Sequence, residues 1–160
     1  MPGYETWGAE ERKELNEVLE TGILMRYGFD GPRKNIWKAK ELEQAICSTF
    51  GVQYAQLTSS GTSALTTAMA ALGIGYGDEV IMPAFTFVAS FEAVLSAGAV
   101  PVLVDVDESL TLDPGAVRKA ITPKTKCIMP VHMCGSMADM DALKTICTEH
   151  NLLLLEDACQ

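Results

Sequence analysis

The sequence predicts an α/β protein with a mostly parallel sheet and helices on both faces, in three layers. Two observations lead to this prediction. From Gly51 onward, five strand-like apolar segments alternate with helical segments of roughly ten residues, as in right-handed βαβ units. Two of these strands, Val80-Ile81-Met82 and Leu152–Leu155, are continuously apolar, which is typical of strands buried on both faces.

The first fifty residues look helical and irregular rather than strand-forming. Residues 9–20 place apolar side chains at helical spacing among charged ones, and Gly22 follows as a helix-ending residue. Residues 36–50 repeat the helical spacing. We therefore expect residues 1–50 to form an N-terminal helical segment and residues 51–160 to belong to the sheet-containing domain.

The remaining elements follow from apolar periodicity and from turn residues. Strands are expected at 54–58, 79–82, 100–106, 125–131 and 152–156, and helices at 62–72, 87–97, 113–121 and 139–150. Asp113-Pro114 supplies an N-cap followed by proline at the first helical position. Ligands of parallel sheets bind at the carboxyl ends of the strands, so the residues just after each strand are the candidate site.

Composition excludes several classes of protein. The formal net charge of −9 argues against a nucleic-acid-binding surface, which needs Lys and Arg. The sequence has no apolar run near the ~18 residues that a membrane span needs, and no basic and apolar leader that would indicate secretion. The 5 cysteines have no CxxC spacing and indicate a reduced, mostly core-filling set. We expect a cytoplasmic protein.

A metal site is not expected. His132 and Cys134 are close in sequence, but the sequence lacks a second closely spaced pair of potential ligands. Structural zinc sites usually have two such pairs. A hydrogen-bonded loop histidine and a buried thiol are the simpler interpretation.

Ser59-Ser60-Gly61-Thr62-Ser63 follows the first expected strand and opens a helix. A helix N-terminus offers free N–H groups and partial positive charge to a phosphate, and Gly61 would allow close approach. The segment matches neither GxGxxG nor GxxxxGK[ST], which disfavours nicotinamide-dependent dehydrogenases and P-loop enzymes. An ordinary Ser/Thr N-cap remains the alternative.

Two further strand ends carry candidate residues. Asp157 follows the leucine-rich strand, where it would either pair with a cation such as a protonated pyridine nitrogen or be solvated or bind magnesium. Phe85-Thr86-Phe87 opens another helix, and an aromatic side chain there would stack on a flat ring or pack in the core.

Taken together and in order, these segments resemble the DegT/DnrJ/EryC1/StrS aminotransferases. The matching motifs are residues 59–64, 77–83, 85–87, 104–107, 121–126, 130–132 and 156–158. Members of this family are fold-type I enzymes that use pyridoxal 5′-phosphate, mostly on keto sugars and related cyclic ketones, in polysaccharide or antibiotic biosynthesis. The resemblance implies the large, cofactor-binding domain of such an enzyme for residues 51–160, in incomplete form.

The resemblance also implies roles for individual residues. The cofactor contacts that it assigns are Gly61, Thr62, Ser63, Phe87, Asp157 and Gln160. The first three would hold the phosphate, and Phe87 would stack on the ring. Asp157 would pair with the pyridinium nitrogen, and Gln160 lies where the family places His or Gln near the phenolic oxygen.

In the family, the lysine that forms the Schiff base follows this Asp further along the chain, beyond Gln160. We therefore expect these residues to be the N-terminal half of a longer enzyme, with the small C-terminal domain absent. Some members carry histidine in place of the lysine and act as sugar 3-dehydratases, which stays open as an alternative. A catalytically inactive binding or regulatory protein is the other alternative.

The remaining implications concern substrate and partners. Residues 130–133 and 138–141 are similar to the aminotransferase-like synthases of aminohydroxybenzoate. The family uses an amino-acid donor, usually glutamate or glutamine, and forms homodimers. The aromatic residues Tyr4, Trp7 and Trp37 would serve such a dimer contact or pack on their own domain.

Overall fold

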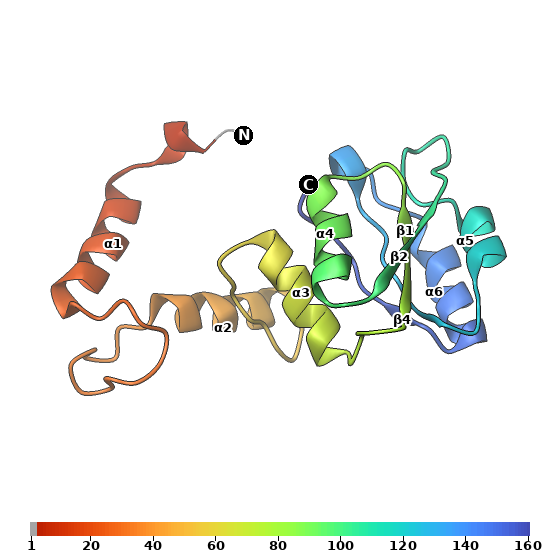
Figure 1. Cartoon of the computed structure of the whole chain (residues 1–160). Coiled ribbons are helices and arrows are strands. Elements are labelled where there is room, and N and C mark those ends of the chain that lie inside the picture. Colours follow the sequence, from red (N-terminus) through yellow and green to blue (C-terminus); the bar gives the residue numbers. More distant parts are fainter. Residues whose placement is uncertain (1–2) are drawn as a thin grey trace. The chain divides into compact units, whose positions relative to one another are not determined.

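The computed structural model describes residues 3–160 (Figure 1), so residues 1 and 2 of the predicted N-terminal segment lie outside the described part. The chain divides into two compact units, Met1–Leu57 and Thr58–Gln160. The predicted domain boundary after residue 50 stays a prediction. No helix within residues 3–160 is both long and apolar enough to cross a membrane.

The first unit contains the short 3-10 helix η1 (Tyr4–Thr6) and two α-helices, α1 (Ala9–Thr21) and α2 (Lys38–Phe50). Both α-helices were predicted. Gly22 ends α1 with a φ of 68°, a left-handed conformation that favours glycine.

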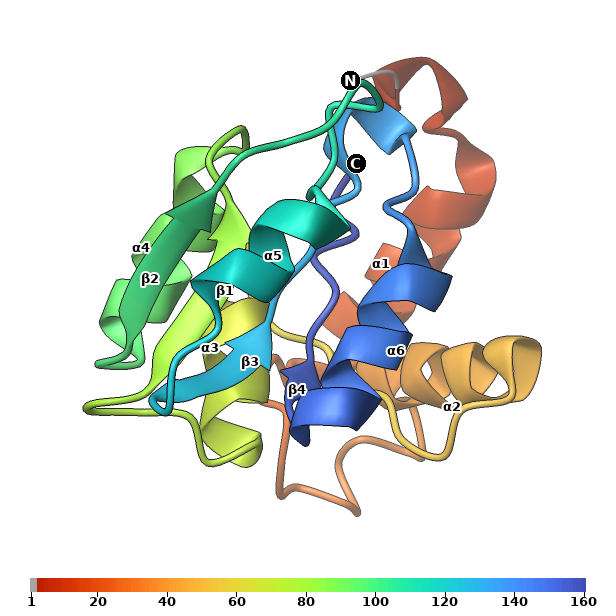
Figure 2. The same cartoon turned by 90° about the vertical axis from the view of Figure 1, so that its right-hand side faces the viewer.

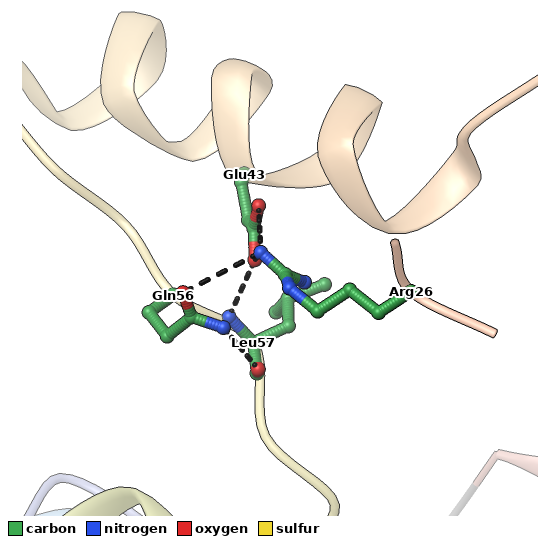
Figure 3. A network of polar contacts seen from close by, with 4 residues as sticks. All are labelled: Arg26, Glu43, Gln56 and Leu57. Carbon is green, nitrogen blue, oxygen red and sulfur yellow. Dashed lines mark hydrogen bonds and ion pairs between the residues drawn. The ribbon is translucent and has the colours of Figure 1, made fainter. Parts of the chain in front are cut away.

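A polar network around Glu43 of α2 connects three parts of this unit (Figure 3). Arg26 Nη2 lies 2.7 Å from Oε1 and 2.8 Å from Oε2 of the buried Glu43 side chain. Glu43 Oε1 also accepts a 2.8 Å hydrogen bond from the Leu57 backbone N–H. These bonds, that from Arg26 first, lower the pKa of Glu43 below its ordinary value of 4.5.

The same network accompanies a wrong prediction, because the strand expected at residues 54–58 is absent. The Leu57 N–H is taken by the Glu43 carboxylate, and the Leu57 carbonyl accepts a 2.9 Å hydrogen bond from Gln56 Nε2. Side chains thus satisfy both backbone groups that a sheet neighbour would otherwise use. Residues 54–58 therefore have a strand-like composition but do not pair with a strand of the sheet.

The second unit holds a four-stranded, entirely parallel sheet in the order β2-β1-β3-β4. Its strands are β1 (Glu79–Pro83), β2 (Val100–Val104), β3 (Thr125–Ile128) and β4 (Leu153–Leu154). Its helices are α3 (Gly61–Ala71), α4 (Val88–Ser96), α5 (Pro114–Ala120), the 3-10 helix η2 (Met133–Gly135) and α6 (Met140–His150). The last three strands are shorter than predicted.

Helices cover this sheet on both faces, as predicted (Figure 2). In β1, Val80 and Met82 pack in one buried cluster with α3 and α4, whereas Ile81 between them packs in a second cluster with α5 and α6. All three side chains are fully buried. A strand that is apolar at consecutive positions is therefore explained by a sheet with a hydrophobic core on each side.

Pairing of the chain after β4 extends beyond the strand itself. Leu155 N–H donates to the Ile128 carbonyl at 3.0 Å, and Asp157 N–H donates to the Pro130 carbonyl at 2.9 Å. The Asp157 carbonyl in turn accepts from His132 N–H at 3.1 Å. These bonds fix the backbone of Asp157 at the carboxyl edge of the sheet, close to where the strand order reverses between β1 and β3.

Candidate functional site

A partly open pocket lies at the carboxyl edge of the sheet in the second unit. Its empty volume is about 360 Å³, part of which is open solvent. Five of the predicted site residues line it: Gly61, Thr62, Phe87, Asp157 and Gln160. Ser63 does not line it. The structure thus brings together residues that are nearly 100 positions apart in the sequence.

Asp157 provides a buried carboxylate in this pocket, with only 5% of its surface exposed. Oδ2 accepts a 2.7 Å hydrogen bond from Ser90 Oγ, and Oδ1 accepts a 3.3 Å hydrogen bond from the Cys159 backbone N–H. Within residues 3–160, it forms no ion pair with a Lys, Arg or His side chain. A buried carboxylate that lacks a cationic partner is suited to a cationic ligand group.

The N-terminus of α3 forms another wall of the pocket. Ser60 is the N-cap, and its Oγ accepts from Ser63 N–H at 3.1 Å. Ser63 Oγ in turn accepts from Ser60 N–H at 3.0 Å, which completes a capping box and explains why Ser63 is not among the lining residues. The alternative of an ordinary cap therefore applies to Ser60 and Ser63, while Gly61 and Thr62 face the pocket.

Gly61 is needed for close packing inside the site. A Cβ atom at this position would lie 2.8 Å from Cys159 Sγ, closer than side chains tolerate.

Cys159 is exposed, and its hydrogen bond to the Asp157 carboxylate raises the pKa of its thiol. Cys134 is exposed as well, so the expectation of core-filling cysteines is met by Cys127 and Cys147 but not by these two.

Phe87 and Gln160 complete the predicted set. Phe87 precedes α4 as its N-cap residue, and its side chain is 65% exposed, so it is free to cover a ligand rather than fill the core. The side chain of Gln160 is oriented by a 2.7 Å hydrogen bond from Cys134 N–H to its Oε1. This bond leaves the amide NH₂ group of Gln160 to donate to another group.

His132 is a hydrogen-bonded loop residue. Its Nε2 lies 3.1 Å from Glu156 Oε2, and its Nδ1 accepts from Ala138 N–H at 3.3 Å. Both ring nitrogens therefore have protein partners.

Sequence reasoning assigned no role to two residues of the site, Thr86 and Ser90. They are four positions apart, at the beginning of α4, and their hydroxyl oxygens lie 2.9 Å from each other. The available signal was a pair of hydroxyl residues at helical spacing directly after a strand end. Their connection to Asp157 spans 67 residues and is not visible in the local pattern.

Comparison with known proteins identifies the family. The model of the DegT/DnrJ/EryC1/StrS aminotransferase family matches residues 5–160. The chain belongs to this family. A curated relative, 3-amino-5-hydroxybenzoate synthase of Amycolatopsis mediterranei, is 43% identical over 159 residues, which is 99% of this chain. The chain spans 39% of the length of that relative.

Solved structures agree with the family and the fold. The crystal structure of 3-amino-5-hydroxybenzoic acid synthase superposes with a TM-score of 0.88 at 43% identity, covering 98% of this chain and 39% of the other. NtdA of Bacillus subtilis, solved with bound pyridoxamine phosphate (PMP), gives a TM-score of 0.83 at 38% identity, covering 93% and 32%. The predicted α/β fold of a pyridoxal-phosphate-dependent transferase is thereby confirmed.

A member with a different reaction is also similar. The GDP-4-keto-6-deoxy-D-mannose-3-dehydratase of Escherichia coli, solved with hydrated pyridoxal phosphate, gives a TM-score of 0.81 at 28% identity. The superposition covers 96% of this chain and 39% of the dehydratase chain. Because NtdA and the dehydratase both hold forms of this cofactor, the comparisons confirm pyridoxal 5′-phosphate as the cofactor of the family.

Proposed function

We propose that this chain forms the cofactor-binding part of a pyridoxal-phosphate-dependent aminotransferase, which transfers an amino group from an amino acid to a keto sugar or related cyclic ketone. The supporting observation is the pocket at the carboxyl edge of the sheet. It is lined both by the N-terminus of α3 and by the buried carboxylate of Asp157. These two features suit the phosphate and the ring nitrogen of this cofactor.

The residues of the pocket fit the cofactor. Gly61 and Thr62 would hold the phosphate, because backbone N–H groups at a helix N-terminus bind anions. Phe87 would cover the flat ring, and the free amide NH₂ of Gln160 would donate to the phenolic oxygen. Asp157 would hold a proton on the ring nitrogen, because an opposite charge favours the protonated form. When bound, the cofactor supplies an electron sink for bond breaking at the α-carbon of the amino acid.

The substrate class rests on the family and on its members. The 43% identity to 3-amino-5-hydroxybenzoate synthase favours a cyclic ketone acceptor. The family resemblance favours a keto sugar, and the name of the similar 3-dehydratase gives a GDP-linked keto sugar. Glutamate or glutamine is the proposed amino donor.

Dehydration at a sugar is the second candidate, favoured by the structural match to the 3-dehydratase. It would use the same pocket and cofactor. In sequence terms, the family distinguishes the two reactions by a lysine or a histidine that follows the Asp further along the chain. The lower identity of 28% to the dehydratase, against 43% to the synthase, places aminotransfer first.

The proposal is tested with the product of the complete gene that encodes these residues. Incubation with pyridoxal phosphate, glutamate or glutamine and a set of cyclic ketones should yield the corresponding amines. Asp157→Ala should abolish this turnover, whereas Asp141→Ala, which changes an exposed carboxylate on α6, should not. Dehydration without amine formation would support the second candidate, and cofactor binding without any turnover would support a regulatory protein.

We also propose a cytoplasmic homodimer, as the family resemblance implies. Tyr4 and Trp7 are 82% and 56% exposed in the first unit and suit a contact between copies. Trp37 is half-buried instead, with Arg33 Cζ 5.1 Å and Lys40 Nζ 5.0 Å from its ring centroid. Sedimentation of the complete gene product should give the mass of two chains, and a monomer would contradict this part of the proposal.

A further inference from the structure

A chain of hydroxyl groups leads from the pocket wall to the buried carboxylate. Thr86 Oγ1 lies 2.9 Å from Ser90 Oγ, and Ser90 Oγ lies 2.7 Å from Asp157 Oδ2. Ser90 is 1% exposed and Asp157 is 5% exposed, so both residues are largely shielded from solvent. All three residues line the pocket.

The direction of the protons in this chain follows from the chemistry of the groups. A carboxylate only accepts hydrogen bonds, and a serine hydroxyl has one proton to donate. Ser90 therefore donates its proton to Asp157 Oδ2, and the hydrogen bond between the two hydroxyls must run from Thr86 to Ser90. The arrangement has one polarity, with every proton directed toward Asp157.

The backbone fixes each member of this chain. Ser90 is the third residue of α4, and its N–H donates to the Phe87 carbonyl at 3.1 Å. Asp157 is held by hydrogen bonds of its own N–H and carbonyl to Pro130 and His132, in the segment that follows β3. Ser90 lies on α4 and Asp157 at the carboxyl edge of the sheet, so the hydrogen bond between them joins two separate parts of the pocket lining.

We infer that Ser90, supported by Thr86, is a positioning residue that orients the Asp157 carboxylate toward the ring nitrogen of the cofactor. This inference rests on the proposed function. The Ser90 hydroxyl occupies one lone pair of Oδ2, and the Cys159 N–H occupies one of Oδ1. Together with the Cys159 thiol, which also hydrogen-bonds to this carboxylate, these donors restrict its rotation. A carboxylate has about four acceptor sites, so it can still accept a hydrogen bond from a ligand in the pocket.

The test uses the product of the complete gene, as in the test of the proposed function, and PMP labelled with ¹⁵N in the ring. PMP needs no covalent bond to the protein, and the ¹⁵N shift of its ring reports protonation and hydrogen bonding at that nitrogen. With the parent chain at neutral pH, the bound ring should show a pyridinium shift. Ser90→Ala should move the shift toward that of neutral pyridine and weaken PMP binding about tenfold, the typical effect of losing a hydrogen bond to a charged group.

Three further variants separate positioning from a structural role. Ser90→Thr keeps the hydroxyl and should restore the parent shift. Thr86→Val removes only the outer hydroxyl at nearly constant volume, and should give a smaller change in the same direction. Ser96→Ala changes an exposed serine at the other end of α4 and should behave like the parent chain. Thermal unfolding without PMP identifies any variant that does not fold. If Ser90→Ala does not fold, Thr86→Val takes its place as the test.

The outcomes distinguish the inference from the proposed function. No PMP binding by the parent chain, or a neutral ring in its complex, would overturn the proposed cofactor site and the inference with it. A pyridinium shift in the parent complex that stays unchanged in Ser90→Ala and Thr86→Val would overturn the inference alone. A shift that moves in both variants and returns in Ser90→Thr would support it.

Discussion

Replacing Gly61 by alanine should weaken cofactor binding while leaving the fold nearly unchanged. The new Cβ atom would lie 2.8 Å from Cys159 Sγ, whereas ordinary van der Waals contact begins at 3.4 Å. The sulfur must therefore move by about 0.6 Å, from 2.8 to 3.4 Å, at a point where both residues line the pocket. The added methyl group and the displaced sulfur both take space that the phosphate end of the cofactor would use.

The magnitudes differ for binding and for stability. If this crowding breaks one hydrogen bond between the phosphate and the N-terminus of α3, PMP binding loses about 1.5–3 kcal/mol. That loss corresponds to roughly tenfold to hundredfold weaker binding. For the fold, overpacking costs about 1–3 kcal/mol in a closed core, but less here because Cys159 is exposed. Alanine also favours a helix over glycine by up to about 1 kcal/mol, so the melting temperature should change by less than about 4 °C.

The assay is PMP fluorescence titration of four proteins: the parent chain, Gly61→Ala, Cys159→Ala and the double variant. The single Cys159→Ala chain is the reference for the double variant, because it lacks both the sulfur and the thiol hydrogen bond to Asp157. The double variant should regain most of the lost affinity, because its side chain at residue 159 has no sulfur to displace. Unchanged affinity in Gly61→Ala would refute the steric reasoning, and a loss of equal size in the double variant would exclude Cys159 as its cause.

Three further predictions follow from the titrating groups. Asp157→Asn should lower the pKa of Cys159 and speed its alkylation by iodoacetamide, since the carboxylate raises that pKa in the parent; equal rates would contradict the contact. Cys127, whose pKa burial raises to about 12, should stay unmodified at neutral pH in the folded chain, and its labelling before unfolding would contradict the buried position. The pKa of Glu43 is lowered in the folded chain, so its stabilising bonds are present above pH 4.5 and are lost as the pH falls through the pKa of the folded state. The NMR signal of the Leu57 amide, which donates to Glu43, should therefore titrate below pH 4.5 and not above it. This titration should disappear in Glu43→Gln.

Much of the second unit was predictable from sequence because its strands and helices have distinct patterns. The apolar run in β1 indicated burial on both faces, and its side chains indeed alternate between two hydrophobic clusters. Asp113 and Pro114 marked the beginning of α5, where Asp113 accepts a hydrogen bond from Gly115 N–H. These signals act over a few residues, so local physics is enough to place them.

The failures concern interactions between distant residues. The segment 54–58 has the composition of a strand, but the carboxylate of Glu43 binds its Leu57 N–H from α2. A pattern of side chains cannot indicate which partner a backbone group will find. The Ser90–Asp157 bond was missed for the same reason, although Asp157 and residues 85–87, just before α4, were both considered as sites.

The proposed function requires that the pocket at the carboxyl edge of the sheet hold both the phosphate and the ring of pyridoxal phosphate. A ¹H–¹⁵N NMR titration of the protein with PMP tests this requirement. We expect the largest shifts at the amides of Gly61, Thr62, Asp157 and Cys159, with all four saturating together. Shifts concentrated on other elements, or the same changes with inorganic phosphate alone at equal concentration, would contradict it.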